Sequence, residues 1–208
     1  MMETTEYHKI ETLYERDERT HRLKPELVLK NRVYGIINSW QWTEKIDGTN
    51  IRCMFQDGTL TFGGRTAGAQ IHAELVTWLY QNVRADTIRS IFPDGNVVIY
   101  GEGYGAGIQK VGSLYGPTKK FIVFDVRVGQ WWLSWENVCD VAFRLGLDVV
   151  PFVGDMTLQD ATSYVQRGFP SKLGDGTAIA EGLVGRTVET LFDKQGHRLI
   201  VKLKTRDF

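Results

Sequence analysis

The chain has 208 residues, of which 42% are hydrophobic and 24% are charged, so it can bury one good core and has the composition of an ordinary globular protein. Its 25 lysines and arginines balance its 25 aspartates and glutamates, which excludes the overall basic surplus typical of proteins that grip long nucleic acids. No apolar run approaches the roughly 18 residues of a membrane span, and residues 1–20 contain no apolar signal core, so we expect neither membrane insertion nor secretion.

Segments rich in aromatic and β-branched residues, bounded by Gly, Asp or Asn, predict strands between segments with helical spacing. In chain order, strands are expected at residues 39–45, 50–56, 59–63, 96–102, 121–128 and 199–204, and helices after residue 69, at 134–146 and at 158–166. The pairs Asp57-Gly58 and Gly129-Gln130 predict hairpin turns. Hairpins together with separate helices indicate an α+β fold, which we expect to form one domain over residues 1–208.

The run from Thr43 to Asn50, Thr-Glu-Lys-Ile-Asp-Gly-Thr-Asn, places Lys45 two residues before Asp-Gly. A lysine amine is a poor nucleophile at neutral pH because its unperturbed pKa is about 10.4, so a reactive lysine needs nearby cations or burial. Lys202 and Lys204 are candidates for those cations, since residues two apart in a strand share a face, and they could also neutralise phosphate groups. The alternative for these two lysines is the exposed face of a terminal strand.

Asp47, Glu102 and Glu181 are acidic residues in apolar or glycine-rich settings. Acids beside phosphate-binding lysines suggest a hydrated divalent metal ion, because magnesium keeps most of its water ligands. One of the three could instead hold a ribose hydroxyl. For Asp47, the Asp-Gly pair is also a good tight turn in its own right.

Three further features allow both a binding and a structural interpretation. The glycine-rich run 101–107 lacks the spacing of a dinucleotide fingerprint, so it is either a wall beside a flat ligand or an irregular loop. Alternation places Ile122, Phe124 and Val126 on one face of a strand, where Phe124 would stack on a purine or fill the core. Arg65 follows two glycines and would bind phosphate or lie on the surface of a hairpin.

Four segments in order resemble the motifs of the covalent nucleotidyltransferases, the superfamily of polynucleotide ligases and messenger-RNA capping enzymes: residues 45–48, 101–103, 181–184 and 202–204. Within that superfamily the chain is most similar to RNA ligases of the RNA ligase 2 type. Asn50, five residues after Lys45, and the sequence Gly64-Arg65-Thr66 match the RNA-joining branch, whereas DNA ligases usually carry an arginine near the position of Asn50. The likeness covers about residues 40–205.

The resemblance implies an ATP-dependent RNA ligase with the ligase-type, ATP-grasp-like fold of two packed, mainly antiparallel sheets and flanking helices. Such an enzyme holds AMP on a lysine, transfers it to a 5′-phosphate end of RNA or DNA, and seals that end to a 3′-hydroxyl. The resemblance assigns the role of nucleophile to Lys45. It places Glu44 (through its main chain) and Phe124 at the adenine and Glu102 at the ribose. It places Asn50, Arg65, Lys202 and Lys204 at phosphates or the polynucleotide end, and Asp47, Glu102 and Glu181 at Mg²⁺ or Mn²⁺.

Relatives of this type usually continue into a C-terminal domain, whereas this sequence ends at Phe208, four residues past Lys204. We therefore expect no such domain here, and a protein partner is one way to supply nucleic-acid binding. A minimal ligase for nicked DNA, a non-catalytic module that binds nucleic-acid ends and a metabolite-adenylating enzyme are the alternatives. Cys53 and Cys139 lack metal-ligand spacing and favour reduced thiols, so we expect a cytoplasmic protein. The resemblance implies a role in bacterial or phage-like RNA repair.

Overall fold

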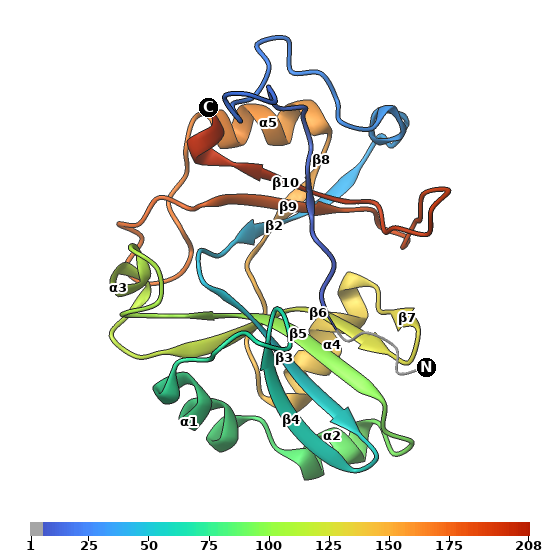
Figure 1. Cartoon of the computed structure of the whole chain (residues 1–208), viewed down its shortest axis with the longest axis vertical. Helices are drawn as coiled ribbons and strands as arrows, with labels where there is room; N and C mark the ends of the chain where they lie inside the picture. The colour runs from blue at the N-terminus through green and yellow to red at the C-terminus, as the bar shows by residue number, and fades with distance from the viewer. Residues whose placement is uncertain (1–5) are drawn as a thin grey trace. The chain divides into compact units, whose positions relative to one another are not determined.

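The computed structural model describes residues 6–208, which form two compact units with one five-stranded sheet each (Figure 1). We name the units by their place in the sequence: the terminal unit comprises Lys9–Ile46 and Pro151–Phe208, and the middle unit comprises residues 6–8 and Asp47–Val150. The two sheets confirm the predicted α+β class with mainly antiparallel strands. Among the described residues, no helix has the length and apolar character that crossing a bilayer requires.

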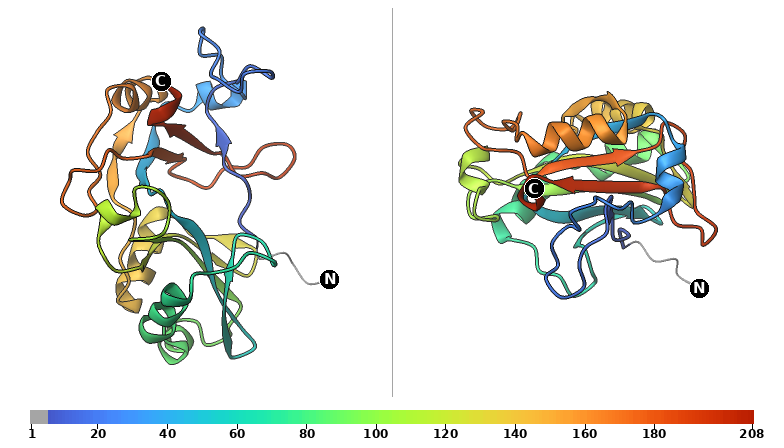
Figure 2. Two further views of the ribbon diagram at one scale, coloured as in Figure 1. Left: turned by 60° about the vertical axis from the view of Figure 1, so that its left-hand side comes forward. Right: turned by 90° about the horizontal axis from the view of Figure 1, so that it is seen from above.

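The sheet of the terminal unit has the strand order β1-β10-β9-β2-β8, in which only the β1–β10 pair is parallel. Its elements are β1 (Glu11–Thr12), the 3₁₀ helix η1 (Arg32–Ile36), β2 (Trp40–Lys45), β8 (Phe152–Met156), α5 (Leu158–Gln166), β9 (Gly182–Arg186), β10 (Ile200–Lys204) and the 3₁₀ helix η2 (Thr205–Asp207). Helix α5 packs against β8, β9 and β10 (Figure 2).

One face of this sheet is apolar, and the two-residue period of a strand places Lys45, Lys202 and Lys204 on the other. The apolar face contributes to a core in which these strand residues are buried: Trp40 and Trp42 of β2, Leu183 of β9, and Val201 and Leu203 of β10. Lys45, Lys202 and Lys204 therefore project from the opposite face, which we call the lysine face. The prediction that Lys202 and Lys204 share a face is confirmed, and the alternating residues Val201 and Leu203 point into the core.

The sheet of the middle unit is antiparallel throughout, with the order β4-β3-β5-β6-β7. Its elements are β3 (Thr49–Gln56), β4 (Thr59–Gly64), α1 (Ala73–Asn82), α2 (Ala85–Ile91), β5 (Val97–Tyr104), α3 (Gly112–Tyr115), β6 (Lys120–Val128), β7 (Trp131–Trp132) and α4 (Trp135–Leu145). Helices α1 and α4 pack against β6. Alternate residues of β3, such as Ile51, Cys53 and Phe55, are fully buried.

Local sequence signals predict the helix ends well. Ser134 caps α4 by accepting a hydrogen bond from the backbone N–H of Asn137, and Gly146 ends that helix in the left-handed conformation with φ of 68°. Helix α5 begins at Leu158 and ends at Gln166, as predicted.

Strand β9 was not predicted, because its sequence Gly-Leu-Val-Gly-Arg contains two glycines, which are weak strand formers. It forms nevertheless because it pairs with β10 on one side and with β2 on the other. Tertiary pairing thus overrides a weak local preference at the centre of the sheet.

Candidate active site

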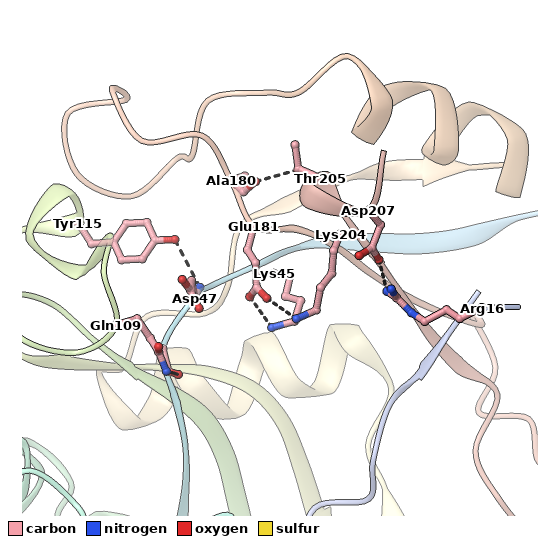
Figure 3. Close-up of polar contacts among 11 residues, drawn as sticks. Arg16, Lys45, Asp47, Gln109, Tyr115, Ala180, Glu181, Lys204, Thr205 and Asp207 are labelled. Atoms are coloured by element: carbon pink, nitrogen blue, oxygen red, sulfur yellow. Dashed lines mark hydrogen bonds and ion pairs between the residues drawn. The ribbon is translucent and has the colours of Figure 1, made fainter. Parts of the chain in front are cut away.

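Lys45 and Lys204 share one carboxylate on the lysine face. Both residues pair in register with Gly182, one from β2 and one from β10. The preceding residue, Glu181, accepts a hydrogen bond on Oε2 from Lys45 Nζ at 2.6 Å and one on Oε1 from Lys204 Nζ at 2.7 Å (Figure 3). The side chains of Lys45, Glu181 and Lys204 are only 22%, 12% and 15% exposed, so solvent screens these charges weakly.

Two opposing effects set the protonation of Glu181. Burial acts to raise the pKa of its carboxyl group, but the charge of Lys45 and the hydrogen bonds from Lys204 and Lys45 outweigh burial and hold the pKa below its usual value. Glu181 is therefore ionised at neutral pH and neutralises part of the positive charge of the two lysines.

Glycine is the only residue type that fits at position 182, between the two lysines. The φ of Gly182 is +151°, and a Cβ atom there would lie 1.9 Å from the carbonyl oxygen of Leu203 and 2.8 Å from Cα of Lys204. Any side chain would push β9 away from β10 and separate Glu181 from Lys204. The glycine in the Glu-Gly-Leu-Val segment is thus required by the close approach of two strands.

Lys202 adds a third cation to this face, two residues before Lys204. Burial, first, and the positive charges of Lys204 and Lys45, second, lower the pKa of the Lys202 amine to about 8. Lys202 is consequently a cation that releases its proton far more readily than an ordinary lysine.

Glu44 lies on the opposite face of β2 from Lys45 and is 1% exposed. Its carboxylate accepts hydrogen bonds from the Ser171 hydroxyl and from the backbone N–H of Lys172, the latter at 2.9 Å. The backbone N–H of Glu44 donates to the carbonyl of Pro151 at 2.8 Å, so a main-chain contact between Glu44 and adenine would have to use the Glu44 carbonyl. The side chain, which the sequence left without a role, ties β2 to the segment that leads to Glu181.

Replacing Glu44 by alanine should lower the free energy of unfolding by about 2–4 kcal/mol, because the buried hydroxyl of Ser171 and the part-buried N–H of Lys172 would lose their acceptor. Glutamine should retain both bonds, accepting from Lys172 and donating to Ser171.

Burial raises the pKa of Glu44 despite the two hydrogen bonds, so the group stabilises the fold at low pH and loses that contribution as the pH rises through its folded pKa. Urea unfolding in acidic and in mildly alkaline buffer should show this pH dependence for the wild type and not for Glu44→Gln. A Glu44→Ala protein as stable as the wild type would contradict the structural role of the Glu44 carboxylate.

In the middle unit the structure brings Asn50 and Glu102 together, directly opposite each other in the β3–β5 pair. Gly48 lies against the same part of β5: a Cβ atom on it would be 2.2 Å from the carbonyl oxygen of Gly103 and 2.7 Å from Cγ of Glu102. The glycine that follows Asp47 is therefore needed for this close contact.

Two residues that the sequence did not indicate hold the turn at Asp47 and Gly48. The backbone N–H of Asp47 donates to the Tyr115 hydroxyl at 3.4 Å, and Gln109 Nε2 donates to the carbonyl of Gly48 at 3.0 Å (Figure 3). Both partners belong to the stretch between β5 and β6, which has no hydrophobic periodicity, so no sequence signal could have found them.

Phe124 lies at an irregularity of the β5–β6 pair, where Tyr100 pairs with Asp125 and Gly101 pairs with Val123. The predicted alternation through residues 122–126 is therefore wrong, because the bulge inserts an extra residue. The ring of Tyr7 meets Phe124 edge-on at 5.1 Å, and the Tyr7 hydroxyl donates to the buried carboxylate of Asp125 at 2.8 Å. The stacking of Phe124 on adenine stays a prediction, now with Tyr7 as a neighbour that the sequence did not reveal.

The remaining predicted residues are distributed over both units. Arg65 is exposed directly after β4. Asp47 and Glu102 belong to the middle unit and Glu181 to the terminal unit. Within residues 6–208, no three His, Cys, Asp or Glu side chains gather as a ready-made metal site. The assignment of the three acids to a metal ion stays a prediction.

Three solved structures of Naegleria gruberi RNA ligase are similar in fold. A mutant with ATP and Mn is 17% identical with a TM-score of 0.68, and the match covers 96% of this chain and 62% of that one. The ligase with PPi is 17% identical with a TM-score of 0.65, and the match again covers 96% of this chain and 62% of that one. An apo mutant is 18% identical with a TM-score of 0.65, and the match covers 81% of this chain and 50% of that one.

These identities establish likeness of fold, and the chain spans about half to three fifths of the length of these ligases. A comparison with curated protein sequences gives no match. The family model described as RNA ligase, in contrast, matches residues 38–204, from the strand that carries Lys45 to the second lysine of β10. On that match, the chain belongs to the RNA ligase family.

Proposed function

We propose that this chain is an ATP-dependent RNA ligase that forms a lysyl-AMP intermediate at Lys45. The observation that carries the proposal is the pair of Lys45 and Lys204 on one sheet face, bridged by an ionised Glu181. Family membership and the fold shared with a ligase studied with ATP and Mn support the same chemistry.

In the proposed first step, the Lys45 amine attacks the α-phosphate of ATP. The Lys45 ammonium first gives a proton to solvent. A nitrogen–phosphorus bond then forms while the bond to the bridging oxygen breaks, pyrophosphate leaves, and the nitrogen gives a second proton to solvent and keeps one in the phosphoramidate. Lys204 and Lys202 would neutralise the charge that develops on the phosphate oxygens. AMP would then pass to the 5′-phosphate of RNA, and a 3′-hydroxyl would displace it to seal the strand.

The other predicted roles remain part of this proposal: Glu44 and Phe124 at adenine, Glu102 at ribose, and Asn50 and Arg65 at the phosphate and the polynucleotide end. An ionised Glu181 with both oxygens already bonded to lysines suits a hydrated ion held through water better than direct coordination. A magnesium or manganese ion held by Asp47, Glu102 and Glu181 would supply further charge neutralisation. Cytoplasmic location and a nucleic-acid-binding partner stay predictions.

The test is incubation with α-labelled ATP and magnesium, followed by intact mass and a denaturing gel, and then addition of RNA with 5′-phosphate and 3′-hydroxyl ends. We expect a mass gain of one AMP and joining of the RNA. If the protein transfers its AMP only to nicked DNA, the substrate is DNA and not RNA. No adduct, from protein shown to carry no AMP at the start, would overturn the proposal.

The binding of ATP should weaken as the pH rises through about 8, because Lys202 then loses the charge that contacts phosphate. Lys202→Arg should keep its charge and bind about tenfold more tightly than the wild type in alkaline buffer, with little difference at neutral pH. ATP titration of both proteins in a Lys45→Ala background, which avoids turnover, measures the difference. Lys194→Arg, at an exposed lysine of the β9–β10 loop, is the matched control. If the affinity for ATP changes with pH in the same way with and without the Lys202→Arg change, Lys202 does not contact phosphate.

A further inference from the structure

The C-terminal turn η2, which directly follows Lys204, binds the backbone on which Glu181 is carried. The backbone N–H of Thr205 donates to the carbonyl of Glu181 at 2.9 Å, and the Thr205 hydroxyl donates to the carbonyl of Ala180, also at 2.9 Å (Figure 3). One residue thus holds two consecutive carbonyl groups at the point where the chain enters β9.

The turn is itself held from the N-terminal part of the terminal unit. Asp207 forms an ion pair with Arg16, and the Asp207 side chain is only 8% exposed (Figure 3). Arg16 also donates from Nη1 to the carbonyl of His21 at 2.7 Å, so the guanidinium has fixed partners on both sides. These contacts restrict the movement of η2 relative to the sheet.

Glu181 needs such support because it is followed by a glycine. Gly182 has no Cβ to limit its backbone, and its present φ of +151° is one of many that the residue can adopt in isolation. The carboxylate nevertheless has to meet two lysines at 2.6 and 2.7 Å. A displacement of about 1 Å in a catalytic group can slow a reaction about a hundredfold.

We propose that Thr205 is a positioning residue that fixes Glu181 between Lys45 and Lys204, and that the Arg16–Asp207 ion pair holds the turn carrying Thr205. The effect on catalysis rests on the proposed function, whereas the effect on the Glu181 carboxylate does not. A purely structural role for η2 would change stability and leave that carboxylate unaffected.

The test compares Thr205→Val with Thr205→Ser and with Thr187→Val. Valine at position 205 keeps the shape and the backbone bond to Glu181 but removes the bond to Ala180, and serine restores it. Thr187 lies at the other end of β9, where its hydroxyl donates to the carbonyl of Glu189 and accepts from the backbone N–H of Leu191 at 3.3 Å, so it controls for the loss of hydroxyl bonds elsewhere in the unit. We expect Thr205→Val to form the AMP adduct about tenfold more slowly than the wild type, while Thr205→Ser and Thr187→Val stay close to it.

A second measurement is independent of activity: crystal structures of Thr205→Val and Thr187→Val, in which the distances from the Glu181 carboxylate to Lys45 Nζ and Lys204 Nζ are compared with 2.6 and 2.7 Å. We expect at least one of these contacts to be lost in Thr205→Val and both to be kept in Thr187→Val. Equal rates and equal Glu181–lysine distances in the two valine variants would overturn the positioning role. If the wild type forms no adduct, the proposed function fails while the distances still decide the role of Thr205. Should Thr205→Val not fold, Asp207→Asn should lengthen the same contacts, and unchanged distances there would equally overturn it.

Discussion

Lys45→Ala and Lys45→Arg should form no detectable AMP adduct, a loss of about a thousandfold or more relative to the wild type. Alanine removes the amine that we propose as nucleophile, and arginine keeps the positive charge but has a guanidinium that stays protonated and does not attack phosphorus. The fold should survive both changes, because Lys45 lies on the polar face of its sheet and contributes nothing to the buried core.

The informative competitor is Lys202, because its lowered pKa of about 8 makes its amine a readier nucleophile than that of an ordinary lysine. Peptide mapping after labelling decides between them. An adduct on Lys202 in the wild type, or undiminished labelling of Lys45→Ala, would show that Lys45 is not the nucleophile. Lys194→Ala, at an exposed position of the β9–β10 loop, should label like the wild type and serves as the control.

Glu181→Ala should slow adduct formation by about a hundredfold, because it leaves the cations of Lys45 and Lys204 without their shared carboxylate. The lysines would then repel one another and leave their present positions. Glu181→Gln should be nearly as slow, since an amide of the same shape carries no charge. The matched control is Glu15→Ala, which removes the partner of Lys24, in a pair where both side chains are more than a third exposed. Such a surface pair contributes little, so this variant should behave like the wild type.

Glu181→Ala should also change how the stability of the fold depends on pH in acid. The folded pKa of Glu181 is lowered, so the group stabilises the fold above its unfolded pKa, and this contribution disappears as the pH falls through the folded pKa. Thermal unfolding should therefore show a smaller loss of stability on acidification for Glu181→Ala than for the wild type. A Glu181→Ala protein with full adenylation activity would show that the carboxylate has no role in placing Lys45.

The sequence by itself determined those features that depend on near neighbours in the chain. Ser134 and Gly146 mark the ends of α4 because a cap is made within a few residues. Lys202 and Lys204 share a face because the side-chain period of a strand is two. The Lys-x-Asp-Gly segment and the glycine after Glu181 were recognisable as motifs, although the sequence did not show that Gly182 is needed for the close approach of β9 to β10.

Only the tertiary structure decided which distant residues meet. Glu181 lies between Lys45 and Lys204 because β9, a strand too rich in glycine to predict, pairs with both β2 and β10. The bulge at Phe124 depends on its register with β5, and Glu44 bonds to Ser171, 127 residues away in the chain. The physical reason is the same in each case: the free energy of a strand pair or of a buried polar contact depends on the partner, and the partner's place is set by the whole sheet and not by the residues on either side.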